Sequence, residues 1–121
     1  REVAYLLGRL LAILERLQRE AQGTRTSVVN RYFAAASTRP VSVFPSMIRL
    51  AQHHLRKLKP GFAYHMNREI GDVMSDIGQF PNSLAAPQQA EFALGYYHQR
   101  EFRPAPKNDG AETSTVQENA Q

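Results

Sequence analysis

The segment from residue 44 to residue 59 constrains the fold most, because its apolar and its basic residues each recur at the spacing of an α-helix. They therefore form an apolar stripe and a basic face. At about 100° per residue, one side of this helix carries the apolar residues Phe44, Met47, Ile48, Ala51, Leu55 and Leu58. The opposite side and its flanks carry the basic residues Arg49, His53, Arg56, Lys57 and Lys59. The apolar stripe must be buried against other elements, whereas the basic face can either bind an anion or simply keep a bundle soluble.

Other segments of the chain show the same helical signal. Residues 2–22 carry a leucine-rich stripe that Gly23 can terminate, and residues 28–37 form a shorter periodic segment. Pro40 suits the first turn of the third helix, while Pro45 either kinks that helix or marks its true start. Residues 62–77 form a fourth helix closed by Gly78, and a fifth runs from residue 85 or 86 to residue 101.

These segments predict an all-α fold, a compact bundle of about five helices over residues 1–103. The fifth helix is apolar around its whole circumference, so we expect it to fill the centre of the bundle or to bind a second surface. Gly8 and Gly95 are expected to admit a close neighbour. Residues 104–121 hold Val116 as their single sizeable apolar residue, and they predict a flexible polar tail.

Composition excludes several classes of protein. The chain has no Cys, which rules out disulfide frameworks and thiolate zinc sites and agrees with a cytoplasmic location. No apolar run reaches the roughly 20 residues of a membrane span. The chain starts at Arg1 rather than Met, as expected either of a trimmed start or of a segment from a longer polypeptide.

The positive charge is concentrated in the first half of the chain. Residues 1–59 contain 11 Lys and Arg residues against 3 acids, a balance of 11 − 3 = +8, although the whole chain carries only +4. Such asymmetry favours a polyanionic partner, with nucleic acid ahead of an anionic membrane surface. The candidate nucleic-acid-binding residues are Arg25, Arg31, Arg49, His53, Arg56, Lys57 and Lys59.

No catalytic activity, metal or cofactor is predicted. The chain contains no Gly-rich phosphate loop, HExxH or GxSxG motif, and no Cys/His finger. One ridge of the fourth helix carries ligand-type side chains, namely His65, Glu69, Asp72 and Asp76. A metal site also needs ligands from a second element, and one helix does not provide them. We therefore interpret this ridge as a solvated or subunit-facing acidic surface.

Four strings of the sequence resemble, in the same order, those of one known protein family. The strings are Tyr5-Leu-Leu-Gly-Arg-Leu-Leu11, Arg31-Tyr-Phe-Ala-Ala-Ala-Ser37, Arg49-Leu-Ala-Gln-His-His-Leu55 and Phe92-Ala-Leu-Gly-Tyr-Tyr-His-Gln-Arg100. They are similar to the C-terminal helical region of the large subunit of type I-C CRISPR Cascade complexes. In that family this region is also made separately, by internal translation, as the small subunit of the complex. A chain without the large subunit's long N-terminal portion resembles that product.

The resemblance implies a non-catalytic subunit that lines the belly of an RNA-guided complex and helps to hold the displaced DNA strand of the R-loop. It also implies partners: the backbone subunits that carry CRISPR RNA, the large subunit and other small-subunit copies. The DNA-contacting residues named above come from helix geometry and charge rather than from the resemblance. Two other classes remain open, a purely structural subunit that bridges its neighbours without touching DNA and, less well supported, a helix-turn-helix regulator.

Overall fold

The computed structural model describes residues 2–22 and 28–101, which form five helices and, over those ranges, no strand. The helices are α1 (Val3–Gln22), α2 (Val28–Thr38), α3 (Pro40–Leu55), α4 (Pro60–Ile77) and α5 (Ala86–Glu101). The predicted all-α bundle of five helices is therefore confirmed. The predicted tail at residues 104–121 lies outside the described residues.

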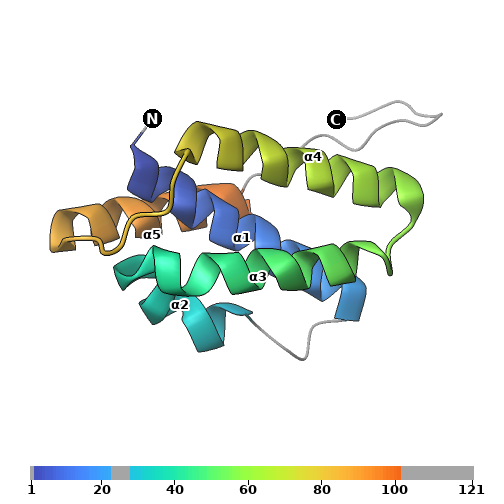
Figure 1. Cartoon of the computed structure of the whole chain (residues 1–121), viewed down its shortest axis with the longest axis horizontal. Helices are drawn as coiled ribbons and strands as arrows, with labels where there is room; N and C mark the ends of the chain where they lie inside the picture. The colour runs from blue at the N-terminus through green and yellow to red at the C-terminus, as the bar shows by residue number, and fades with distance from the viewer. Residues whose placement is uncertain (1, 23–27, 102–121) are drawn as a thin grey trace.

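The central helix of the bundle is α1. It runs through the middle of the molecule, with the other helices packed around it (Figure 1), and it is buried on most of its circumference. Of the two expectations for the fifth helix, a central place is wrong, because α5 buries only Phe92, Gly95 and Tyr96, and the binding of a second surface stays a prediction. Its outer side leaves Leu94 46% exposed and Tyr97 54% exposed.

Leucine side chains of α1 and aromatic side chains from the other helices build the core. Leu7, Leu10 and Leu11 of α1 are fully buried. The ring of Phe33 on α2 meets those of Phe92 and Tyr96 edge to face, with ring centroids 5.4 Å and 5.3 Å away. This is a favoured geometry for aromatic pairs. These contacts fix α2 against α5.

Proline and glycine set the helix ends. Pro40 and Pro60 occupy the first turns of α3 and α4, where the missing amide hydrogen costs little. Gly78 ends α4 with φ of 80°, a left-handed backbone angle that glycine adopts without strain. Pro45 lies inside α3, so the helix already runs at Val41 and the interpretation of a later start is wrong.

The connection from α4 to α5 is bound to the start of α3. The Val41 amide donates to the Pro81 carbonyl at 3.0 Å, and the Leu84 amide donates to the Thr38 carbonyl at 3.0 Å. The Phe80 ring stacks on the buried Phe44 ring with centroids 5.5 Å apart. No helix of the described residues is long and apolar enough to cross a membrane.

Candidate nucleic-acid interface

The five basic residues of the segment 44–59 all lie on the surface of the bundle. Arg49, His53, Arg56, Lys57 and Lys59, which we call the basic face, are exposed. On the opposite side of α3, Phe44, Met47 and Ala51 are buried. The predicted separation of an apolar stripe from a basic face is thus present in the structure, and removal of these charges leaves the core untouched.

The end of α3 differs from the sequence prediction. The helix stops at Leu55, four residues before the predicted end at Lys59. The amides of Lys57 and Leu58 then bond to the carbonyls three residues earlier, at 3.0 Å and 3.2 Å, which forms a tight final turn. Lys59 has an extended backbone (φ −60°, ψ 140°), as the residue before a proline prefers. Arg56, Lys57 and Lys59 therefore belong to the turn between α3 and α4 rather than to a helix.

Two further candidates lie on or before α2. Arg31 is exposed on α2, and its guanidinium lies 6.0 Å from the centre of the Tyr32 ring, a cation–π distance. Arg25 falls outside the described residues.

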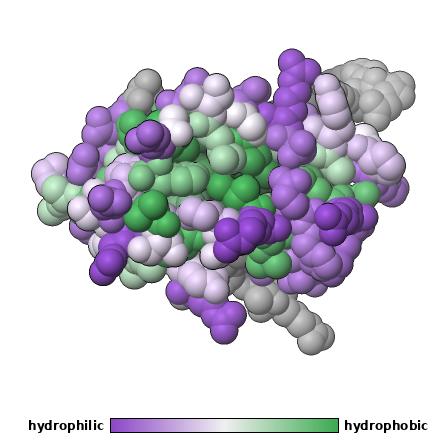
Figure 2. All heavy atoms as spheres, viewed as in Figure 1, coloured by the Kyte–Doolittle hydropathy of each residue, from purple (hydrophilic) through white to green (hydrophobic). Residues whose placement is uncertain are grey.

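In Figure 2, hydrophilic side chains gather at the end of the molecule where α3 passes into α4, beside an apolar band between these two helices.

The neighbouring histidines of α3 have opposite environments. His53 is exposed, whereas His54 is only 3% exposed and neither of its ring nitrogens has a hydrogen-bond partner among the described residues. Burial lowers the pKa of His54, and the charges of Lys57 and His53 lower it further. His54 is therefore neutral near pH 7 and adds no charge to the basic face. The 100° step between neighbouring helical residues explains the difference.

Two surface residues of α4 were missed by sequence reasoning. Tyr64 and Arg68 are exposed one turn apart, and Tyr64 keeps 67% of its surface accessible. The apolar stripe of α4 at Met66, Ile70 and Val73 is buried on the other side. The signal was available, because an aromatic residue opposite such a stripe has no place in the core.

The acidic ridge of α4 does not assemble a metal site. His65, Asp72 and Asp76 are exposed and Glu69 is half-buried. Within the described ranges, no three His, Cys, Asp or Glu residues are grouped so that they could hold a metal ion. Glu69 instead accepts a long hydrogen bond of 3.5 Å from Gln99 of α5, whose own amide oxygen accepts from Arg9 at 2.8 Å.

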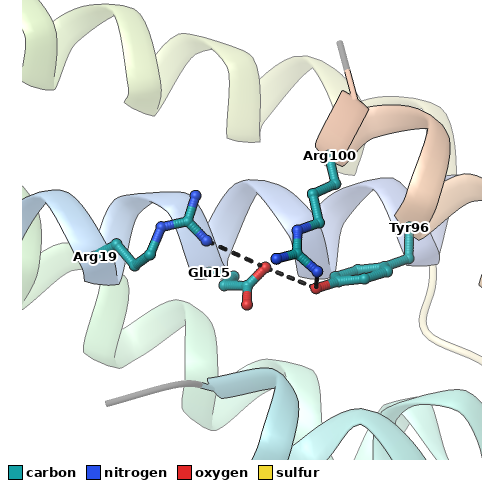
Figure 3. Close-up of polar contacts among 4 residues, drawn as sticks. All are labelled: Glu15, Arg19, Tyr96 and Arg100. Carbon is teal, nitrogen blue, oxygen red and sulfur yellow. Dashed lines mark hydrogen bonds and ion pairs between the residues drawn. The ribbon is translucent and has the colours of Figure 1, made fainter. Parts of the chain in front are cut away.

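A second polar cluster joins α1 to α5. Glu15 is only 5% exposed; its carboxylate accepts a 2.8 Å hydrogen bond from the Tyr96 hydroxyl and lies 3.6 Å from the Arg19 guanidinium. Arg100 donates to the same hydroxyl at 3.4 Å, so the Tyr96 hydroxyl links the Glu15 carboxylate to a second guanidinium (Figure 3). Burial, and then the bond to Glu15, raise the pKa of Tyr96. The Glu15–Arg19 pair joins two residues one helical turn apart, and the Glu15 carboxylate is buried where it meets Tyr96.

The comparisons with known proteins identify the family. The model of the family described as CRISPR-associated protein (Cas_Csd1) matches residues 1–103, and a search of curated proteins found no match. This confirms the resemblance to a CRISPR Cascade protein that four strings of the sequence carry. Because the match spans most of the chain, the protein belongs to the Cas_Csd1 family of CRISPR-associated proteins.

Proposed function

We propose that this chain acts as the non-catalytic small subunit of a type I-C CRISPR surveillance complex and that its basic face stabilises the displaced non-target DNA strand of the R-loop. Membership in the Cas_Csd1 family implies a place in a Cascade-like complex, and the type I-C subtype is consistent with the family name. One observation carries the DNA contact: Arg49, His53, Arg56, Lys57 and Lys59 are all exposed on one helix and the turn after it.

The proposed contact is electrostatic and independent of base sequence. Lys and Arg side chains neutralise phosphates and release condensed counterions, and this gives affinity without reading bases. A displaced strand changes its sequence with every target, so this mode of binding suits it. Pairing between the guide RNA and the target strand supplies the specificity, as in other RNA-guided systems. Arg31 and Arg25 extend the contact from α2 and the segment before it.

The proposal also names partners and excludes others. The partners are the backbone subunits that carry CRISPR RNA, the large subunit, other copies of the small subunit and single-stranded non-target DNA, all in the cytoplasm. We propose no catalytic step, cofactor, membrane or small-molecule substrate, because the sequence contains no pairing of nucleophile and base and no phosphate-binding loop.

A purely structural subunit is the alternative function. Its support is the pair of oppositely charged surfaces, the basic face on α3 and the turn after it, and the acidic ridge on α4, whose residues His65, Asp72 and Asp76 are exposed. Surfaces of opposite charge can dock neighbouring subunits in a defined register. In this alternative, the basic face meets protein rather than DNA.

The deciding experiment replaces Arg49, Arg56 and Lys57 by Ala in the reconstituted complex. We expect normal assembly, with loss of nuclease protection of the displaced strand. The control is a double variant, Asp72→Asn with Asp76→Asn, which alters exposed charges of the other sign and should leave protection intact. Failed assembly of the triple variant would assign the basic face to a subunit interface, and unchanged protection would favour the structural alternative.

A further inference from the structure

We infer that Tyr64 is a base-stacking residue placed at the end of the basic face, and that Arg68 beside it continues the phosphate contacts along α4. The inference deepens the proposed function and rests on it. It concerns α4, whereas the basic face lies on α3 and in the turn that precedes α4, so the two can be tested separately.

The exposure of Tyr64 is the first observation. At 67% exposed, it has the most accessible of the large apolar side chains in the part of the chain that the structure describes. The core side of α4 is already complete, since Met66, Ile70, Val73 and Ile77 are buried there. The phenol ring of Tyr64 therefore contributes little to the core, and its π-face is available to a partner.

The positive surroundings of Tyr64 are the second observation. Lys57 and Lys59 lie in the turn before α4, and Arg68 follows Tyr64 by one helical turn. At about 1.5 Å rise per residue, Tyr64 lies roughly 6 Å along the axis from both Pro60 and Arg68. Asp72 is one turn beyond Arg68, but the structure has no ion pair between them, so the guanidinium stays available to a phosphate.

The start of α4 adds to this positive field. No side chain caps its N-terminus, and its first turn contains no acidic residue. The free amide groups at the start of a helix and the helix dipole attract anions, phosphates among them. The N-cap residue of α4 is Lys59, whereas helices usually have Asp, Ser or a similar residue at this position. A partner with negative charge suits this end of the helix.

Two glycines on the same outer side of α4 are the third observation. Gly61 and Gly71 are exposed, and a Cβ atom added at either would meet nothing within 4 Å. Alanine is a better helix former than glycine, so the fold itself gives no reason for these two glycines. Because glycine has no side chain, the helix backbone is uncovered on either side of Tyr64 and Arg68, and a nucleic-acid strand could lie close against it.

These observations favour single-stranded nucleic acid over a protein partner. Proteins that bind single strands without sequence preference combine a basic track with exposed aromatic rings on which bases stack. Here the basic face and Arg68 provide the positive charges, and Tyr64, which lies between them in the sequence, provides the exposed aromatic ring. A protein contact built on Tyr64 would instead need apolar neighbours, whereas Gly61, Asn67 and Gly71 around it offer none.

The test separates base stacking from phosphate binding. The reconstituted complex is loaded on a pre-opened target whose displaced strand is either oligo-dT or an abasic strand of equal length, so that duplex melting does not enter. The lifetime of strand protection is measured for each. We expect Tyr64→Ala to shorten protection of the oligo-dT strand by roughly 5- to 100-fold and to leave the abasic strand unchanged. Tyr64→Phe keeps the ring and should behave like the wild type.

Two further variants sharpen the comparison. Tyr97→Ala removes another exposed tyrosine, on α5, and should change neither strand. Arg68→Gln should weaken protection of both strands by the same factor, because both retain their phosphates. If Tyr64→Ala behaves like the wild type, or blocks assembly of the complex, the stacking role is overturned while the basic face can still hold the strand. If the wild type protects neither strand, the proposed function itself fails.

Discussion

Gly8 of α1 faces the backbone of α5 and Gly95 of α5 faces the backbone of α1, and together they bring the two backbones into contact. A Cβ atom added at Gly8 would lie 1.9 Å from the Phe92 carbonyl oxygen, and one added at Gly95 would lie 1.9 Å from the Tyr5 carbonyl oxygen. In both cases the obstructing atom is backbone, which cannot rotate away. The sequence prediction that both glycines admit a close neighbour is confirmed.

This backbone contact predicts that Gly8→Ala and Gly95→Ala each destabilise the protein, although alanine favours helices. Overpacking of this kind costs about 1–3 kcal/mol and sometimes more. Gly71→Ala is the matched control, since its Cβ meets open space, and it should stabilise the protein by roughly 0.5–1 kcal/mol. Urea unfolding followed by circular dichroism measures all three. Equal effects at positions 8 and 71 would contradict the close contact.

The Tyr96 hydroxyl predicts a second stability effect. Tyr96→Phe removes the donor that bonds the buried Glu15 carboxylate at 2.8 Å, and we expect a loss of about 1–3 kcal/mol in the free energy of unfolding. Tyr97→Phe, at the exposed neighbour, should be neutral within about 0.5 kcal/mol. A double-mutant cycle with Glu15→Leu, which removes the acceptor, measures the coupling, and a coupling energy near zero would show that the hydroxyl does not hold Glu15.

His54 predicts that acid destabilises the fold. Its ordinary pKa is 6.5, and burial lowers that pKa in the folded chain, so the unfolded state binds more protons once the pH falls below about 6.5. The stability contributed by neutral His54 is therefore complete above that pH and is lost as the pH falls from 6.5 toward the lowered pKa. Urea midpoints at pH 7.5, 6.5 and 5.5 check this. His54→Leu should flatten the dependence, whereas the exposed control His53→Leu should retain it.

The sequence predicted all five helices, but tertiary contacts decided where some of them end and which of them are buried. Apolar spacing at Leu58 extended the third helix too far, although Pro60 already disfavours a helical residue before it. Apolar residues lie all around α5, and this pattern is the same for a central helix and for a peripheral helix with apolar residues on its outer side. In the structure, Leu94 and Tyr97 lie on that outer side. Local spacing could not show the hydrogen bond between the buried Glu15 carboxylate and Tyr96, because the two residues are 81 positions apart in the sequence.

The candidate site was predictable where it depended on local periodicity. The exposure of Arg49 and His53 follows from their position opposite Phe44, Met47 and Ala51, because both sets lie on α3 and share one helical period. Arg56, Lys57 and Lys59 lie in the turn after the helix, where the period does not apply. The position of Tyr64 opposite the buried stripe of α4 was also readable from this period, and its 67% exposure adds that no neighbouring helix covers the ring. Whether these residues bind DNA stays a prediction.

The last prediction compares two arginines at the two ends of α3. Arg39 precedes the helix and Arg56 follows it, and both are exposed, so replacing either by Ala removes the same charge and should change stability by no more than about 0.5 kcal/mol. If Arg56 contacts a phosphate and Arg39 does not, the two variants differ in the salt dependence of single-strand affinity. The slope of log K against log salt should fall by about 0.7 for Arg56→Ala and stay unchanged for Arg39→Ala. Fluorescence anisotropy with an oligo-dT strand, titrated from low to moderate salt, gives both slopes. Identical slopes in the two variants would mean that net charge alone, and not the position of the basic face, attracts the strand.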